Sequence, residues 1–94
     1  MLGGFRMRYA IYADLSRRLT EQERSALAEA LEASVPDCGC VGLQKGPNDE
    51  VYFSVEALSE ATARAQTEHY MTVMLQKVAL SLEYALTLND EPVA

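Results

Sequence analysis

The residues best suited to metal or thiol chemistry are two cysteines that lie only two positions apart. Cys38 and Cys40 follow Asp37, and the single histidine of the chain, His69, is distant in sequence. Thiolates and imidazoles suit zinc, but a structural zinc site takes four ligands, and Cys-x-Cys with one distant histidine falls short of that set. We therefore expect no metal site. Two neighbouring cysteines also do not make a disulfide framework.

Catalysis requires a nucleophile or an acid–base group beside a partner in a pocket. Because His69 is the only histidine, a serine or cysteine triad would have to use it. The sequence contains no glycine-rich phosphate loop,. We expect no catalytic residues and no cofactor, and we favour a protein that is not an enzyme.

Composition excludes several classes of function. The chain has 94 residues, of which 49% are hydrophobic, and a formal net charge of −6. Such a chain is typical of one globular domain, here residues 1–94, with 89–94 expected to fray. The negative charge disfavours binding to nucleic acid and to anionic membranes. No apolar run has the length of a membrane span or a signal peptide, so we expect a cytoplasmic location,.

The elements that must position these residues follow from hydrophobic periodicity. Strands are predicted where apolar and polar residues alternate, at 5–13, 41–45, 51–55 and 80–88,. Helices are predicted at 20–35 and 59–79,. Thr20 and Glu23 have the spacing of a capping box, and Pro36 ends the first helix. Turn residues at 46–49 predict a hairpin between the second and third strands.

The order strand, helix, strand, strand, helix, strand resembles the ferredoxin-like superfold. That resemblance implies an α+β sandwich, β-α-β-β-α-β, with a four-stranded antiparallel sheet and two helices on one face. It covers nearly the whole chain but rests on the order of elements, and unrelated functions share the superfold.

The face of the sheet opposite the helices is the first candidate interaction surface. It should carry Arg6, Arg8, Tyr12, Tyr52, Glu56 and Glu83. Tyrosine and arginine are enriched at the centres of protein interfaces. The arginines can meet the glutamates on neighbouring strands or on a second copy. Aromatics on this face also occur in RNA-recognition domains, but the basic Gly- and aromatic-rich strand motif of that family is absent.

The second predicted helix has two apolar stripes. One contains Ala63, Thr67, Tyr70, Met71, Met74 and Val78. The other contains Ala61, Ala65, Thr72, Leu75 and Ala79, with Glu68 near its middle,. One stripe must cover the sheet, and the other is available to a partner. Periodicity leaves open which is which, so Ala65 and Met74 are both interface candidates.

These features favour a small acidic, non-catalytic protein-interaction module that forms a homodimer. Its role would be accessory, regulatory or that of a phage-type inhibitor, with another protein as a possible partner. One alternative is a small-ligand sensor resembling the amino-acid-binding regulatory domains of the same topology. Another is a cofactor-free small-molecule enzyme of the dimeric ferredoxin-like type, with a pocket lined by Tyr9, Tyr84 and His69.

Overall fold

Six elements make up the part of the chain that the structure describes. The structure is a computed structural model and describes residues 6–35, 38–43 and 48–89. The elements are β1 (Met7–Leu15), α1 (Glu21–Ser34), β2 (Cys38–Leu43), β3 (Asp49–Ala57), α2 (Glu60–Lys77) and β4 (Tyr84–Asn89). Their order agrees with the periodicity of the sequence.

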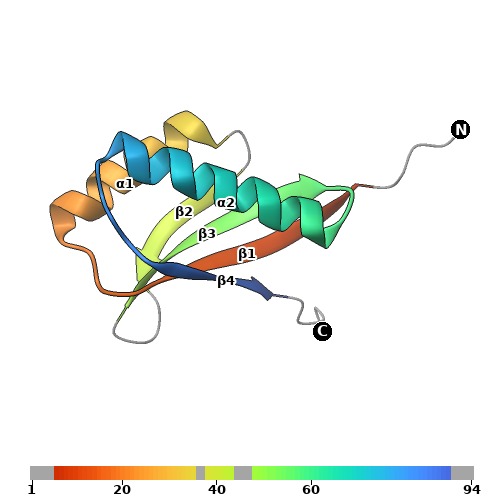
Figure 1. Ribbon diagram of the computed structural model, residues 1–94, viewed down its shortest axis with the longest axis horizontal. Coiled ribbons are helices and arrows are strands. Elements are labelled where there is room, and N and C mark those ends of the chain that lie inside the picture. Colours follow the sequence, from red (N-terminus) through yellow and green to blue (C-terminus); the bar gives the residue numbers. More distant parts are fainter. Residues whose placement is uncertain (1–5, 36–37, 44–47, 90–94) are drawn as a thin grey trace, which may run out of the picture.

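The strands form a sheet with the order β2-β3-β1-β4. All three pairings, β2 with β3, β3 with β1 and β1 with β4, are antiparallel. Both helices lie on the same side of the sheet (Figure 1). The prediction of an α+β fold with an antiparallel sheet and two helices is therefore confirmed.

Strand alternation separates a core face from an outer face. On β1 and β3, the side chains of Ile11, Ala13, Val51, Phe53 and Val55 point toward the helices and have no exposed surface. Because register partners in antiparallel strands share a face, the pairs Tyr12↔Tyr52 and Arg8↔Glu56 place these four residues together on the outer face. The alternation read from the sequence therefore assigned the faces of β1 and β3 correctly.

Helix α1 begins with the capping box that the sequence predicts. The Thr20 hydroxyl accepts a hydrogen bond from the Glu23 amide at 3.1 Å, and the Glu23 carboxylate accepts one from the Thr20 amide at 2.9 Å. The Arg17 guanidinium donates to both carboxylate oxygens of Glu23, at 2.8 and 2.9 Å. These hydrogen bonds, first that of Arg17 and then that of Thr20, lower the pKa of Glu23 to about 2,.

The structure decides which stripe of α2 faces the sheet. Ala63, Thr67, Met71 and Met74 have no exposed surface, whereas Ala61, Ala65 and Thr72 are exposed. The helix ends in a Schellman motif, in which the Leu80 amide donates to the Leu75 carbonyl at 3.0 Å,. Ala79 occupies the left-handed position of that motif with φ of 56°, where glycine is the usual residue,.

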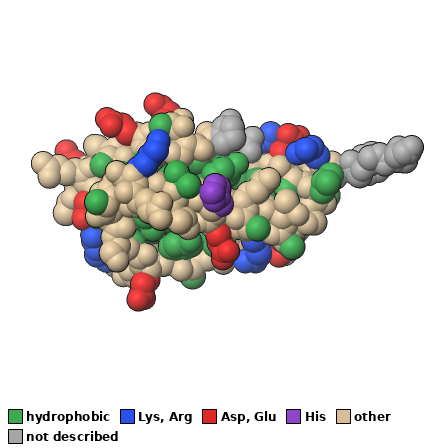
Figure 2. All heavy atoms as spheres, turned by 45° about the horizontal axis from the view of Figure 1, so that its top comes forward, with side chains coloured by type: hydrophobic (Ala, Val, Ile, Leu, Met, Phe, Trp, Pro, Cys, Tyr) green, Lys and Arg blue, Asp and Glu red, His purple; other side chains and the backbone are tan. Residues whose placement is uncertain are grey.

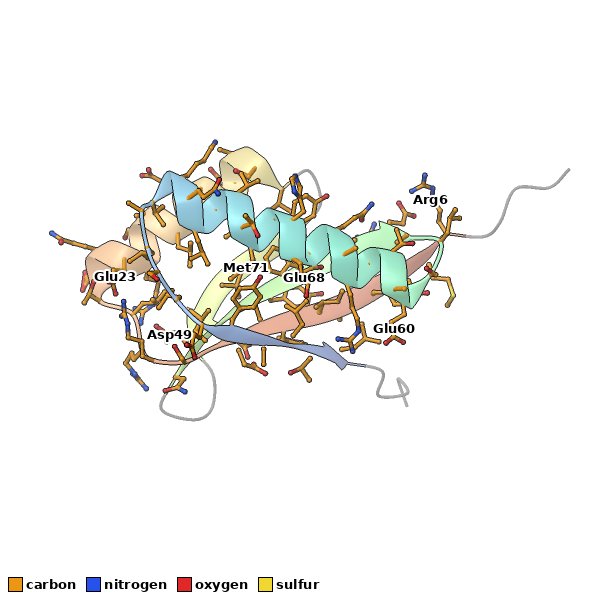
Figure 3. All side chains as sticks on the ribbon, viewed as in Figure 1. Arg6, Glu23, Asp49, Glu60, Glu68 and Met71 are labelled. Carbon is orange, nitrogen blue, oxygen red and sulfur yellow. The ribbon has the colours of Figure 1, made fainter. Side chains whose placement is uncertain are left out.

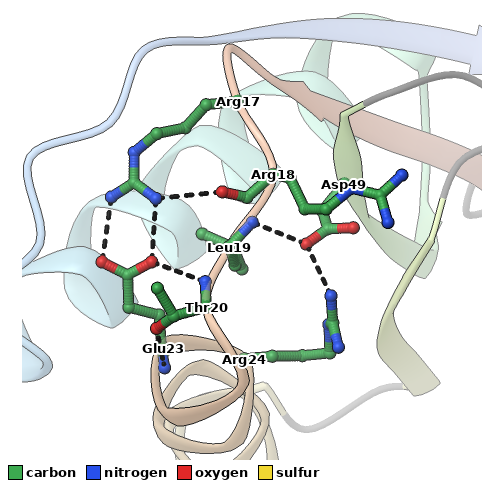
Figure 4. A network of polar contacts seen from close by, with 7 residues as sticks. All are labelled: Arg17, Arg18, Leu19, Thr20, Glu23, Arg24 and Asp49. Carbon is green, nitrogen blue, oxygen red and sulfur yellow. Dashed lines mark hydrogen bonds and ion pairs between the residues drawn. The ribbon is translucent and has the colours of Figure 1, made fainter.

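A buried carboxylate ties the start of β3 to the connection between β1 and α1 (Figure 4). Asp49 has no exposed surface, and its Oδ2 accepts hydrogen bonds from the Leu19 amide at 2.8 Å and from Arg24 Nη2 at 3.0 Å. Among the described residues, Asp49 Oδ1 and Arg24 Nε are buried without a hydrogen-bond partner. The ionised form of the Asp49 carboxylate is thus stabilised largely by its ion pair with Arg24.

Several element boundaries differ from the sequence prediction. Strand β1 runs two residues further than expected, to Leu15, and the final strand begins at Tyr84 and not at Leu80. Asp49, expected in the hairpin turn, is the first residue of β3. Turn composition could not show this, because the partners of Asp49 come from the distant segment around Leu19. The predicted turn residues 46–47 and residues 90–94 of the predicted tail 89–94 lie outside the described residues. Asn89, the first residue of that tail, is the last residue of β4.

We predict that Asp49→Asn destabilises the fold by about 2 to 3 kcal/mol. Removing one member of a buried ion pair leaves the other charge uncompensated, and Arg24, whose side chain is 30% exposed, recovers part of its hydration,. Chemical denaturation measures the change. Glu56→Gln, at an exposed position on the same strand, is the control and should change the free energy of unfolding by less than about 0.5 kcal/mol.

A second prediction concerns the pH dependence of the α1 cap. Since the pKa of Glu23 is lower in the folded chain than its ordinary value of 4.5, the cap contributes its full stability above that value. The contribution is lost as the pH falls toward 2. An NMR titration of the Glu23 carboxyl group should show the low pKa, and Arg17→Gln should raise it. An ordinary Glu23 pKa in the unsubstituted protein would contradict the capping geometry.

Candidate interaction surfaces

Two tyrosines occupy the middle of the outer sheet face. Tyr12 of β1 and Tyr52 of β3 are register partners, both are half-buried, and their ring centroids are 5.1 Å apart with the planes tilted by 47°. Neither helix covers this face (Figure 1). The outer face therefore presents an aromatic pair to solvent, as the sequence predicted.

Polar side chains flank the tyrosine pair on the side where β1 begins. Arg8 Nη1 donates to Ser54 Oγ at 2.9 Å, across the strand pair. Glu56 is the register partner of Arg8 and is exposed. Arg6 lies just before β1, also exposed, at the end of the sheet where the chain enters it (Figure 3). This end of the face carries the arginines.

The opposite end of the outer face is acidic. Asp14 and Glu50 are register partners on β1 and β3. Burial, and then the charge of Asp14, raise the pKa of Glu50. The Thr87 hydroxyl donates to Asp14 Oδ2 at 2.6 Å. Glu83 lies just before β4, and its carbonyl accepts from the Ser16 amide at 3.0 Å. The outer face therefore has Arg6, Arg8 and Glu56 at one end and only carboxylates, those of Asp14 and Glu50, on the strand pair at the other end.

The arginine–glutamate pairs suggested by the sequence do not form within the described chain. The ion pairs found there include Arg17–Glu23, Arg24–Asp49 and Arg64–Glu60. Arg8 bonds to Ser54 in place of Glu56. Glu83 sits beside Ser16, eight residues from Arg8 along β1 and hence about 26 Å away at roughly 3.3 Å per residue,. An Arg8–Glu83 contact can form only with a second copy.

The core face of β4 is the second candidate surface. We call Leu82, Tyr84, Leu86 and Leu88 the β4 row. All four contact the core cluster and all are only half-buried, in contrast to the buried core residues of β1 and β3. The helices pack mainly on the other strands, α1 against β2 and α2 against β3 and β1. The β4 row therefore lies beside α2 without a helix above it (Figures 1 and 3).

A shallow groove of about 440 Å³ continues this surface along the end of α2. Its lining is mostly apolar or small: Thr72, Leu75, Gln76, Ala79, Leu80, Ser81 and Leu82. Apolar side chains reach the surface on both sides of His69 in Figure 2. The alternation of 80–88 had assigned the β4 row to the core. The burial of the row is incomplete because of where the helices lie. The sequence of the strand itself contains no signal of that placement.

The two interface candidates on α2, Ala65 and Met74, lie in different environments. Ala65 is exposed on α2 and available to a partner. Met74 has no exposed surface, so it is part of the core of the folded chain and is withdrawn as an interface residue. The sequence could not separate them because both stripes have similar apolar character.

The residues considered for a catalytic pocket are spread over the fold. Tyr9 pairs in register with Val55, and Tyr84 pairs with Leu15, six residues from Tyr9 along β1. That spacing corresponds to about 20 Å. His69 is exposed on α2, with its ring centroid 6.4 Å from that of Tyr70. The described side chains therefore do not bring the three proposed pocket residues together.

The metal candidates are only partly described. Within the described residues, no three histidine, cysteine, aspartate or glutamate side chains gather as metal ligands. Asp37 and the side chains of Cys38 and Cys40 lie outside that description.

Among the helices of the described ranges, none has the length and apolar character needed to cross a bilayer.

Comparisons with protein-family models, with curated proteins and with solved structures gave no match to this chain. Function must therefore be argued from the two surfaces themselves.

The environment of the β4 row can be tested through Tyr84. Burial, and then the charge of Glu68 on α2, raise the pKa of Tyr84 above the ordinary 10.0. We predict that Glu68→Gln lowers the Tyr84 pKa partway toward that value, because burial remains. A spectroscopic titration of the phenol measures it. Glu56→Gln, on the other face of the sheet, should leave the Tyr84 pKa unchanged; an equal effect of both variants would contradict the placement of Glu68 on the same side of the sheet as Tyr84.

Proposed function

We propose that this chain is a small acidic, non-catalytic protein-interaction module that acts as a homodimer. The observation that carries the proposal is the apolar β4 row, which stays only partly buried because the helices of the described chain pack mainly on the other strands. Exposed apolar strips of this kind mark interaction sites on small proteins. The two helices of one chain leave this strip open, and a protein partner would remove it from water.

With this function we also propose a specific fold and a cellular location. The strand order, with both helices on one face, is compatible with a ferredoxin-like sandwich, and we propose that arrangement. We also propose a cytoplasmic role as an accessory or regulatory protein. The sensor and enzyme alternatives gain little support from the groove beside α2, because it is shallow and none of its lining residues is an acid–base group or a nucleophile activated by one,.

The outer sheet face is a second candidate surface for the same association. Its arginine end and its acidic end are self-complementary, because a twofold axis through the Tyr12–Tyr52 pair would place each end over the opposite end of the partner. Against it, Arg8 and Asp14 already have hydrogen-bond partners within the chain. Within the described chain, the exposed part of the β4 row is not covered by another element. For that reason we favour the flank formed by α2 and β4.

Light scattering tests the proposal. We expect the protein to be a dimer at micromolar concentration, because association would remove the apolar surface of the β4 row from water. A monomer at that concentration would contradict the proposed function. Tyr12→Glu, compared with Tyr12→Phe, distinguishes the two surfaces. We expect both variants to remain dimeric; dissociation by Tyr12→Glu alone would assign the interface to the outer face.

A further inference from the structure

We propose that β4 pairs edge to edge with the β4 of a second copy, antiparallel and centred on Leu86, so that the two sheets join into one. This inference rests on the proposed function and names the partner and the contact. Strand β4 is at the edge of the sheet, with β1 on one side (Figure 1). Among the described helices and strands, β1 is also its only extensive neighbour. The other side of β4 is therefore a row of backbone groups that the described chain leaves open.

The hydrogen bonds to β1 identify which backbone groups of β4 point to the open side. The Ser16 amide donates to the Glu83 carbonyl at 3.0 Å, and this pair continues the register in which Leu15 faces Tyr84. Facing residues in antiparallel strands alternate between pairs that exchange hydrogen bonds and pairs that do not. Because Glu83 bonds to the β1 side, the N–H and C=O groups of Tyr84 point away from β1.

The same alternation continues along the strand. Ala85 and Thr87 direct their backbone groups to β1, whereas Tyr84, Leu86 and Leu88 direct theirs to the open side,. These three residues also belong to the β4 row, whose side chains are only half-buried. The open backbone groups and the partly exposed apolar side chains of β4 therefore belong to the same residues.

Strand β4 lacks the features that usually keep edge strands apart. Tyr84–Asn89, with the sequence YALTLN, contains no charged residue and no proline. Its pairing with β1 is regular over the whole strand. Charged side chains, prolines and bulges are the common protection of sheet edges. The other edge strand, β2, contains Gly39 and Gly42, which weaken a strand, and α1 packs against it. Of the two edges, β4 is thus the better suited to pairing.

A second copy of β4 complements this edge in its own register. With a twofold axis at Leu86, the two Leu86 residues exchange hydrogen bonds, and Tyr84 of each chain exchanges them with Leu88 of the other. Every open backbone group of these three residues then has a partner. Each chain has a net charge of −6, but no charged residue lies within the paired strands.

Pairing also covers part of the apolar surface of the β4 row. Ile11 and Phe53 lie on central strands, with a strand on each flank, and have no exposed surface. Leu86 has a strand on only one flank and is half-buried. A twofold axis perpendicular to the sheet keeps both rows on the helix side and packs the two Leu86 side chains together. One partner strand therefore satisfies the backbone groups and shields the apolar side chains.

Disulfide cross-linking tests the proposed register. In the dimer, Ala85 lies opposite Thr87 of the second copy, in a pair without hydrogen bonds whose Cα atoms are about 4.5 Å apart, within the range of a disulfide. Ala85→Cys and Thr87→Cys are prepared in separate chains that also carry Cys38→Ser and Cys40→Ser. After the two are mixed and oxidised, we expect the mixed disulfide dimer to exceed each homodimer by roughly tenfold or more. Like positions are about 8 Å apart across the strands, too far for a disulfide. Mass spectrometry measures the three species.

A second experiment separates the backbone contact from the side chain. Leu86→Pro removes an N–H that has no partner within the sheet, and edge strands accept proline where the N–H faces solvent. We expect this variant to raise the dimer dissociation constant by roughly a hundredfold or more. Leu86→Val removes a similar volume but keeps the N–H, and should change that constant by roughly threefold at most. Sedimentation velocity measures both variants, and circular dichroism verifies that they fold.

The outcomes separate this inference from the proposed function. Preferred formation of the mixed disulfide, together with dissociation by Leu86→Pro alone, would support edge pairing. Comparable yields of the mixed and like disulfides, or a folded Leu86→Pro variant that remains dimeric, would overturn it and leave self-association standing. Equal weakening by Leu86→Pro and Leu86→Val would overturn it in favour of a contact through side chains. If Leu86→Pro unfolds, the cross-linking result decides. A monomeric unsubstituted protein would overturn both the inference and the proposed function.

Discussion

The rest of this structure depends on how two helices cover one face of a sheet. Phe53, Ile11 and Val55 have no exposed surface because α2 lies over β3 and β1. Helix α1 packs against α2 and β2, and so the cover is displaced toward that edge. At the other edge, Leu86 and Leu88 contact the core but stay half-exposed. The β4 edge is thus less covered than the two central strands, β1 and β3.

Burial of Asp49 shows that local order in this fold depends on distant segments. Its carboxylate accepts the amide hydrogen of Leu19 and the guanidinium of Arg24, thirty and twenty-five residues away. The interaction sets the entry of α1 relative to the start of β3, and so the position from which α1 reaches the sheet. These two partners offset the cost of removing the Asp49 carboxylate from water,.

The two candidate surfaces differ in how much of their chemistry is satisfied inside one chain. On the outer face, Arg8 bonds to Ser54, Asp14 accepts from Thr87, and the two tyrosines contact each other. Polar groups satisfied in this way, or by water, need no partner. Apolar side chains cannot form hydrogen bonds with water in the same way. Only burial removes their surface from water. The flank of α2 and β4 therefore has the stronger physical reason to associate.

Sequence alone determined the order of the elements and the two faces of β1 and β3. Period-two alternation identified the strands, because side chains on a strand point to opposite sides, and the Thr20–Glu23 spacing identified the start of α1 because capping is local. Boundaries near Tyr84 and Asp49 were displaced because their pairing and contacts involve distant residues. The aromatic pair of the outer face was predictable for the same local reason as the strands.

Only the tertiary structure decided which stripe of α2 is buried. Met74 and Ala65 belong to stripes of similar apolar character, and helical periodicity cannot rank them. The choice depends on the direction from which α2 meets β1 and β3, which the packing of the whole chain sets. The incomplete cover of the β4 row has the same origin. A strand pattern specifies which side chains turn inward, but whether a helix lies above them is a property of the assembled layers.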